Sequence, residues 1–351
     1  MKILMLVDWR VARLKADSDT IQSPDKIVTG RPYWFFKYWP DPVMEVDVLD
    51  IGNLPWIHSV EGGILHFYVI QSLIAYLKRK KYDLIISHSA RSALVFAFLR
   101  SMVKERSPLH VVIDVGCFNG GRDNAAELFL IKQASRSLGG IITHSSIQSG
   151  YYDRYMPHVP YRFIPFGVDA DYFRPMDLRQ EDFILSFGSR ARDYPTMLEA
   201  WTKVPHKNTR LKIIGIDKIP GIDYTPANVD LLGRVPVKSL MSHMARARFI
   251  VIPLPNCKYS CGQMSFLQSM AMRKSCIVTK TPSSEDYLRD AYDALLVCPH
   301  DPEDLADKIN VLLQDDALIA SVGRKARQTI EARYNEQNMA RDIYKFISTF
   351  I

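Results

Sequence analysis

Short apolar runs alternate with helix-like hydrophobic spacing along the whole chain. In the first half, five runs rich in aliphatic residues predict buried strands, at residues 2–7, 44–51, 82–88, 109–116 and 139–145. Between these runs, apolar residues recur at helical spacing over 63–80, 89–104 and 123–138. A strand followed by a helix, repeated, predicts a parallel sheet with right-handed crossovers. We therefore expect one Rossmann-like unit over the first 165 residues.

The same pattern begins again after a segment marked by proline and glycine, Ile164–Pro175. Six more runs predict strands, at 182–188, 210–215, 228–235, 248–254, 275–280 and 294–299. Helical spacing intervenes at 194–204, 237–247, 265–273, 284–290 and 302–314. The last stretch, 318–351, is helical with a break near Tyr334 and Asn335.

The fold class that follows is α/β, with two Rossmann-like domains at 1–165 and 166–335. A final helix at 336–351 is expected to pack back on the first domain. The length of 351 residues suits two domains. Ligands of such sheets bind outside the carboxyl ends of the strands, so we expect both sets of strand ends to face a central cleft.

Composition removes several classes of protein. Apolar residues make up 47% and charged residues 24%, which excludes disordered and collagen-like chains. The net charge is +7, and the first 165 residues hold 20 Lys and Arg against 15 Asp and Glu. The densest basic run, Lys78–Lys81, lacks the glycine and aromatic interleaving of an RNA-binding face, so no nucleic-acid partner is expected.

Cysteine usage and hydropathy indicate a compartment. Five cysteines include one close pair, Cys257 and Cys261, without zinc-ligand spacing, which favours reduced thiols in a cytoplasmic protein. The first apolar run is too short for a signal peptide, and the longest apolar stretch is too short to span a bilayer. Membrane contact, if there is any, is expected to be peripheral.

Common nucleotide and nucleophile motifs are missing from the sequence. The first strand is followed by Asp8, Trp9 and Arg10, without the glycines of a dinucleotide fingerprint. The P-loop pattern and the G-x-S-x-G elbow are also absent, which removes P-loop kinases and the usual α/β-hydrolases.

Three segments, in order, resemble the GT-B glycosyltransferases, particularly family 4 (glycosyl transferases group 1). They are IPFGVDADYFRP at Ile164–Pro175, SFGSRARDYPTMLEAW at Ser186–Trp201 and SCGQMSFLQSMAMRKSCIVTKTPSSEDYL at Ser260–Leu288. The resemblance covers roughly residues 164–334. It implies a nucleoside-diphosphate sugar as donor, bound by the second domain, and transfer with retention of anomeric configuration.

The chemistry of these segments suits a diphosphate. A helix N-terminus with free N–H groups plus a cation can hold one, and Gly262, Gln263, Met264 and Ser265 open a predicted helix. The turn after the strand at 182–188 supplies Gly188 and Ser189, followed by Arg190 and Arg192. We expect both arginines to stabilise the departing diphosphate, which requires no cofactor and no obligatory metal. The alternative is that they are solvated loop arginines.

The third segment also departs from the family pattern. Gln268 stands where the family has a glutamate that binds the ribose, and Ser260 stands at the other glutamate eight positions earlier. Gln268 can still accept a hydrogen bond through its amide oxygen. Glu285 matches a family glutamate near the donor, although a cap at the start of a helix also explains it. Arg234 lies where this fold receives the nucleobase, with a structural role equally open.

The acceptor side is expected at strand ends of the first domain. Asp114 or the backbone at Gly116 takes the place of a family histidine, and a carboxylate there can position or deprotonate a hydroxyl. A strand-end Asp that caps the next turn is the equally weighted alternative. His88 and His144 end neighbouring strands and face the cleft by position, although a structural role is the usual one for a lone histidine.

The nature of the acceptor is indicated only loosely. The aromatic loop Arg31–Pro40 can stack on sugars, meet a membrane or fold onto its own domain, and the last interpretation is favoured. Lys78–Lys81 can touch anionic lipid. The sequence therefore predicts transfer of a hexosyl unit to a glycan or lipid-linked glycan, at the inner face of the cell membrane if lipid is involved. A non-catalytic nucleotide-sugar-binding protein and a GT-B-type epimerase remain as alternatives.

Overall fold

The first domain is a six-stranded parallel sheet with its strands in the order β4-β1-β5-β6-β7-β8. The computed structural model describes the whole chain except residues 42–43, 53–60, 62–66, 117, 119–124, 206–207 and 223–224. The sheet strands are β1 (Lys2–Val7), β4 (Glu45–Leu49), β5 (Leu84–His88), β6 (Leu109–Asp114), β7 (Gly140–Thr143) and β8 (Tyr161–Phe163). The helices between them are α2 (Val69–Lys78), α3 (Ala90–Met102), α4 (Ala125–Ser135) and α5 (Ser149–Tyr155).

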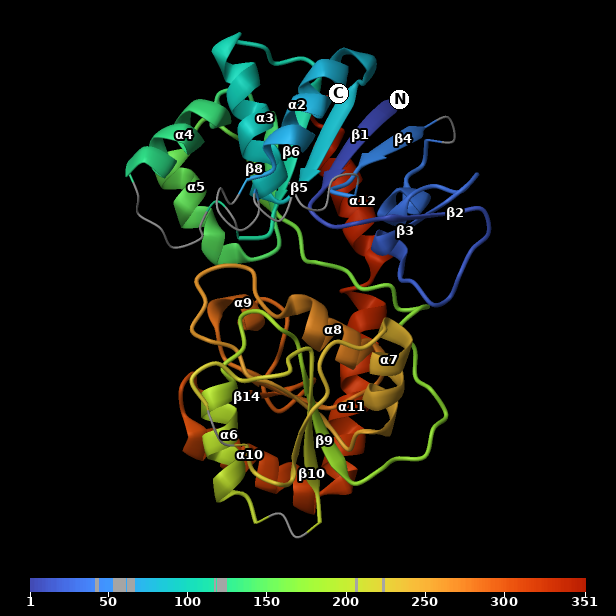
Figure 1. The fold of residues 1–351 in the computed structure, drawn as a ribbon, viewed down its shortest axis with the longest axis vertical. Coiled ribbons are helices and arrows are strands. Elements are labelled where there is room, and N and C mark those ends of the chain that lie inside the picture. Colours follow the sequence, from blue (N-terminus) through green and yellow to red (C-terminus); the bar gives the residue numbers. More distant parts are fainter. Residues whose placement is uncertain are drawn as a thin grey trace.

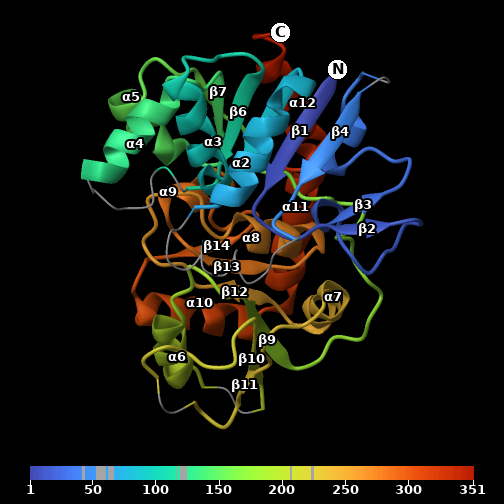
Figure 2. The same ribbon diagram turned by 45° about the horizontal axis from the view of Figure 1, so that its top comes forward.

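The second domain repeats the plan with the strand order β11-β10-β9-β12-β13-β14, again parallel (Figure 2). Its strands are β9 (Phe183–Phe187), β10 (Arg210–Ile214), β11 (Val229–Leu231), β12 (Ile250–Ile252), β13 (Cys276–Thr279) and β14 (Leu295–Val297). Its helices are α6 (Tyr194–Lys203), α7 (Val237–Arg246), α8 (Gln263–Ala271), α9 (Pro282–Glu285), α10 (Pro302–Gln314) and α11 (Asp316–Ala332). The predicted α/β class with two Rossmann-like sheets is confirmed.

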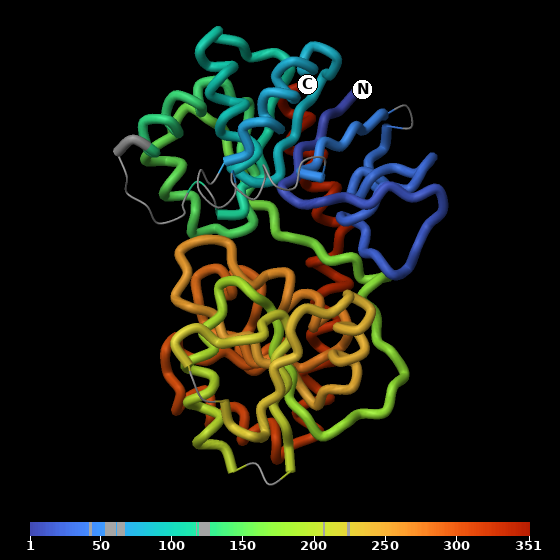
Figure 3. Tube along the Cα trace, in the orientation of Figure 1, coloured from blue at the N-terminus to red at the C-terminus, as the bar shows by residue number. Residues whose placement is uncertain are grey.

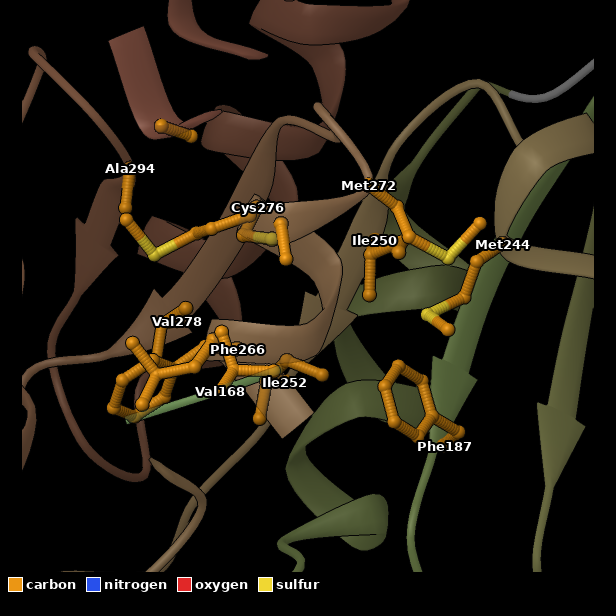
Figure 4. Close-up of a cluster of buried hydrophobic side chains, with 14 of the residues drawn as sticks. Val168, Phe187, Met244, Ile250, Ile252, Phe266, Met272, Cys276, Val278 and Ala294 are labelled. Carbon is orange, nitrogen blue, oxygen red and sulfur yellow. The ribbon is translucent and has the colours of Figure 1, made fainter. Parts of the chain in front are cut away.

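Helices cover both faces of the second sheet because its central strands β9, β12 and β13 are apolar on both sides. Leu185, Ile250 and Val278 face a core shared with α7, α8 and α11, while Ile184 and Val251 face the core under α6 and α10. Figure 4 shows the first of these cores, in which Phe266 of α8 lies beside Val278 and Ile252. Buried parallel sheets require continuous apolar strands of this kind.

The first sheet is covered differently on its two faces. Helices α2 to α5 lie on one side, against Leu4, Ile85 and Val112. The other side is covered by the aromatic loop, whose 3-10 turn η2 (Trp34–Tyr38) buries Trp34, Phe35 and Phe36. The loop therefore folds onto its own domain, which is the interpretation that the sequence analysis favoured. Its large rings form part of the hydrophobic core.

The last helix, α12 (Glu336–Ile347), packs on the same face of the first sheet as the aromatic loop (Figure 1). Its Met339, Ile343 and Phe346 are buried there, and Trp39 donates a hydrogen bond from Nε1 to the carbonyl of Ala340 at 3.2 Å. The chain thus crosses between the domains twice, and Figure 3 shows the two crossings next to each other.

The two crossings are joined by backbone hydrogen bonds. Val168 donates to the carbonyl of Tyr334 at 2.9 Å, and Glu336 donates to that of Val168 at 3.0 Å. Lys37 of the first domain lies 2.6 Å from the Glu336 carboxylate and 3.3 Å from that of Asp169. These contacts join the two segments through which the chain passes between the domains.

Four short elements were not predicted: β8, α5 and the small parallel pair β2 (Ala12–Leu14) and β3 (Lys26–Val28). The pair lies on the side of the first domain, outside the main sheet. The predicted helix at 284–290 is α9, which begins earlier and is shorter. The predicted helix start at 63 falls outside the described residues. Within the described part of the chain, no helix combines the length and apolar character needed to cross a bilayer.

Candidate functional site

A cavity of about 510 Å³ lies between the domains, at the carboxyl ends of both sheets. The first domain contributes Asp8, Arg91 and Gly116 to its wall. The second domain contributes Arg190 and the turn Tyr259–Gly262. Both predicted donor segments and one predicted acceptor position therefore meet at one cavity.

Arg190 and Arg192 stand in the same turn and have different surroundings. Arg190 is exposed and lines the cavity. Arg192 is turned into the protein, where Nε donates to the carbonyl of Phe187 at 3.0 Å and Nη1 to that of Ala191 at 2.9 Å. Burial lowers the pKa of the Arg192 guanidinium. Of the two, Arg190 is free to meet a ligand, while Arg192 holds the turn.

Gly188 makes the position of Arg192 possible. Its φ of +122° lies in a region that side chains disfavour, and a Cβ there would stand 2.5 Å from Nη2 of Arg192. The next residue, Ser189, is exposed. The glycine turn predicted from the sequence thus serves to seat an arginine against the backbone.

Arg192 also ties this turn to the start of α8. Its Nη2 donates to the hydroxyl of Ser265 at 2.5 Å. Gly262 caps the helix in the left-handed conformation, at φ +79°, and a Cβ there would stand 2.6 Å from a methyl of Leu254. Gly262 lines the cavity, so the N-terminus of α8 opens onto it. The positive end of a helix dipole and Arg190 therefore face one space.

The remaining residues predicted to bind the donor differ in their surroundings, and some are buried while others are exposed. Gln263 is buried and donates from its amide to the hydroxyl of Ser283, and Met264 is 46% exposed. Gln268 lies buried in α8. Arg234 is exposed after β11.

Glu285 lies in a separate hollow of the surface. It pairs with Lys280 at 3.3 Å, and the two line this hollow together with Cys298 and Asp304. The structure places Glu285 away from the residues that line the cleft.

That hollow includes a candidate metal group. Among the described residues, Cys298, Asp301 and Asp304 hold their ligand atoms within 4.8 Å of one another. Asp301 accepts the N–H of Asp304 at 3.0 Å, and Asp304 accepts that of Cys298 at 2.8 Å. Asp301 is the N-cap of α10, and Asp304 holds the backbone of the turn that leads into that helix, so both carboxylates have a structural role. The absence of a metal requirement in the cleft stays a prediction.

Asp114 is at the end of β6, fully buried and surrounded by donors. Its Oδ1 accepts from the N–H of Gly116 at 3.0 Å and of Phe118 at 3.4 Å. Its Oδ2 accepts from Tyr152 at 2.7 Å and from the amide of Gln148 at 3.0 Å. This geometry favours the turn-capping alternative, because a carboxylate with four donors does not reach a ligand.

His88 and His144 lie beside the cleft, inside the first domain. Burial lowers the pKa of His88 to about 3 and that of His144 to about 4. His144 Nδ1 donates to the carbonyl of Ile164 at 2.7 Å. His88 packs edge-on against Trp9, with 5.0 Å between ring centroids, and within the described residues neither of its ring nitrogens has a hydrogen-bond partner. Both are neutral core histidines at ordinary pH.

Comparisons with known proteins agree with this architecture. Over 100% of this chain and 99% of the other, sucrose-phosphate synthase from Thermosynechococcus elongatus superimposes with a TM-score of 0.69 at 15% identity. HepE from Anabaena, in complex with UDP-glucose, gives 0.71 at 15% identity over 99% of this chain and 100% of that one. The chain has the GT-B fold.

Sequence comparisons place the family likeness in the second domain of this GT-B chain. Residues 183–315 match the family model described as Glycosyl transferases group 1. An uncharacterized glycosyltransferase from Methanocaldococcus jannaschii is 26% identical over 102 residues, which are 29% of this chain and 28% of the relative. The resemblance expected from the three segments is confirmed.

Sequence reasoning missed Asp8 and Arg91 of the GT-B cleft. Burial raises the pKa of the Asp8 carboxyl, against a hydrogen bond from Ser89 and the charges of Arg91 and Arg190. Asp8 directly follows a predicted buried strand, and residues at this position of a parallel sheet lie at the edge where ligands bind. Its position in the sequence could therefore have marked it as a site residue. Arg91 stands in the first turn of α3, where nothing in the sequence pattern marks it out.

The two domains touch beside the cavity. Gly116 has φ +96°, and a Cβ there would stand 2.8 Å from the ring of Tyr259. Asp286 of the second domain accepts from the backbone N–H of Ser146 at 2.8 Å and from the hydroxyl of Ser145 at 3.0 Å. Gly116 therefore serves as a close contact between domains.

Proposed function

We propose that the protein is a retaining glycosyltransferase that moves a hexosyl unit from a nucleoside-diphosphate sugar to a hydroxyl of a glycan or lipid-linked glycan. The observation that carries this proposal is the meeting of Arg190 and the N-terminus of α8 at one cavity. The opposite wall of that cavity belongs to the first domain. A diphosphate at this place has a cation, helix N–H groups and an acceptor surface around it.

The reaction requires stabilisation of one group above all. The bond between the anomeric carbon and the diphosphate breaks while the acceptor oxygen bonds to that carbon. Negative charge grows on the departing diphosphate, and Arg190 with the N–H groups after Gly262 is placed to stabilise it. Arg192 supports this site by fixing the turn that carries Arg190 and by holding Ser265. A hexose donor is favoured by analogy with HepE, whose structure contains UDP-glucose.

The family glutamate pair has no carboxylate counterpart in this chain. Ser260 lines the cavity, and its N–H donates to Gln148 of the first domain at 3.3 Å. Gln268 is held within α8. We propose that sugar orientation depends on backbone groups around Gly262 in place of two carboxylates.

The aromatic loop is buried, so Trp34, Phe35 and Phe36 offer no surface on which an acceptor sugar can stack. The proposed acceptor site therefore does not include these rings. Asp8, half-buried, lines the cavity together with Arg190 and is an acidic group placed to contact an acceptor hydroxyl; Glu127 of α4 is a second acidic residue of the same wall. Contact of Lys78–Lys81 with an anionic membrane stays a prediction at this point.

The deciding experiment compares Arg190→Ala with Arg179→Ala, two exposed arginines of the same domain. A thermal-shift screen with UDP, GDP, ADP and their sugars first identifies the donor, because ligands that bind only the native state raise its melting temperature. Release of nucleoside diphosphate is then measured with and without glycan acceptors.

Arg190→Ala should lower the rate of release by about 100-fold or more, with little change in the melting temperature. Arg179→Ala should keep most of the rate. Equal rates in the two variants would contradict the role of Arg190. Donor binding without release would indicate a binding protein, and sugar interconversion without transfer would indicate an epimerase.

A further inference from the structure

The end of the first domain that points away from the cleft combines exposed apolar and basic side chains. It is formed by the connections that lead into β5 and β6, at the amino ends of these parallel strands, and lies at the top of Figure 1. Leu77 is 80% exposed, Met102 69% and Val103 56%. Single exposed apolar side chains are ordinary on a protein surface, but these three lie on two connections that the Arg79–Glu105 ion pair joins, so they can act together as one contact surface.

Basic residues surround these three side chains. Exposed Lys78, Lys80 and Lys81 precede β5, and exposed Lys104 and Arg106 precede β6. We call the eight residues together the basic end face.

A salt bridge joins the two halves of the basic end face. Arg79 Nε lies 2.6 Å from the Glu105 carboxylate, which neutralises that acid. The nearby Asp83 accepts the backbone N–H of Lys2 at 2.7 Å. The ion pair brings the ends of α2 and α3 together, so that the apolar tips stand among positive charges.

We propose that the basic end face docks the protein on an anionic lipid bilayer. Lys and Arg side chains are attracted to anionic headgroups, each strengthening binding by about fivefold. Leu77, Met102 and Val103 are placed to enter the headgroup region while the basic groups stay at its surface. Nucleic acid would be attracted by the charges but would gain nothing from contact with the three apolar side chains. Lipid is therefore the occupant that explains both the basic and the apolar residues of this face.

This orientation has a consequence for the acceptor, and that consequence alone rests on the proposed function. The cleft lies at the carboxyl ends of the strands, and the basic end face lies at their amino ends. A bilayer on this face is therefore separated from the cleft by the height of the first domain. A short lipid-linked acceptor does not reach the cleft in this pose, whereas a long or soluble glycan does.

Vesicle flotation of the full chain tests the docking without any donor or acceptor. We expect the protein to float with vesicles of phosphatidylcholine mixed with phosphatidylglycerol, to stay behind with phosphatidylcholine alone, and to be released at high salt. The triple variant Lys78→Glu, Lys80→Glu, Lys81→Glu should bind at least about 100-fold more weakly. A control with the same charge change on the second domain, Arg174→Glu, Arg179→Glu, Arg324→Glu, should bind at least about tenfold more tightly than that variant.

The apolar tips are tested separately. Leu77→Ser with Met102→Ser should weaken binding several-fold and leave the melting temperature unchanged, because both side chains are in solvent. The matched pair Met176→Ser with Leu232→Ser, exposed on the second domain, should not weaken it.

A dye shows which end meets the lipid. An environment-sensitive fluorescent dye attached through Met102→Cys in a Cys298→Ser background should change its fluorescence when anionic vesicles are added. The same dye attached through Met264→Cys should show no change.

Three results would overturn the proposal. They are equal flotation with neutral and anionic vesicles, full binding by the triple lysine variant, and binding to duplex DNA or RNA that vesicles cannot compete away. Because nucleoside-diphosphate release is measured on its own, failure of docking leaves the proposed function intact, and failure of transfer leaves the docking result intact.

Discussion

Two carboxylates at strand ends of the first domain show how burial decides the role of a residue. Asp114 is fully buried with four hydrogen-bond donors around it, and Asp8 is half-buried at the cavity wall. Both follow strands that the apolar pattern predicts. The pattern places each carboxylate at the sheet edge, but the donors around Asp114 come from Tyr152 and Gln148, in elements that local spacing does not bring there.

Asp114→Asn should destabilise the first domain with little direct effect on a chemical step. The asparagine NH₂ group would face either the two backbone N–H donors or the donors from Tyr152 and Gln148, and a donor cannot bond to a donor. We therefore expect a loss of about 2–3 kcal/mol in the free energy of unfolding. Urea unfolding checks it, with Asp153→Asn on the exposed face of α5 as the control. A variant of native stability that has lost all transfer would contradict the structural role.

Three buried histidines, His88, His110 and His144, give the first domain a pH dependence. In the folded state burial lowers the pKa of His88 to about 3, that of His144 to about 4 and that of His110 well below the usual 6.5, so the unfolded chain takes up protons first as the pH falls. Stability is full above pH 6.5 and should fall below it by about 1.4 kcal/mol per pH unit for each histidine.

Urea unfolding at pH 7 and pH 5 measures this loss. His88→Phe keeps a ring against Trp9 and removes one of the three titrating groups, so its loss of stability should be smaller by about a third. An unchanged loss in this variant would contradict the assignment.

At the scale of elements, the apolar runs predicted the strands of both sheets except β8. Most of the predicted strands, such as β5, β9 and β13, are buried on both faces, which is the case in which hydrophobic runs are most informative. The edge strands β4 and β11 are partly exposed. The three residues of β8 have alternating exposure at the sheet edge, and α5 is a seven-residue helix, so neither carries a long periodic signal.

The donor segments were predictable as elements but their inner contacts were not. The glycine turn and the opening of α8 follow from Gly188 and Gly262, whose positive φ values explain the choice of residue. From the sequence, both Arg190 and Arg192 were expected to contact the diphosphate. In the structure Arg190 faces the cavity and Arg192 holds the turn. Which arginine turns inward depends on the carbonyls of the turn and on Ser265, a contact across 73 positions of the chain.

At the scale of the whole molecule, hydrogen bonds join the two domains beside the cavity. Asp286 receives hydrogen bonds from Ser145 and Ser146, and Tyr287 donates to the carbonyl of His144 at 2.7 Å. Contacts of this kind hold one arrangement of two domains while allowing others. Hinge motion is expected at the paired crossings near Val168 and Asn335.

Asp286→Ala should therefore open the cleft without unfolding either domain. We expect a larger radius of gyration by small-angle X-ray scattering, a reversal of that change by a saturating nucleotide, and little change in the melting temperature. Asp290→Ala, further along the same segment, is the control. A variant as compact as the native protein would show that Asp286 does not hold the domains together.

The double crossing also orders events during synthesis. The second domain lies within one continuous stretch of chain, so its core can close as soon as that stretch has left the ribosome. The first domain begins earlier but finishes later, because Met339, Ile343 and Phe346 arrive with the last helix. Until then the face that they cover stays open, and a nascent chain stalled before residue 336 carries a finished second domain behind an incomplete first one.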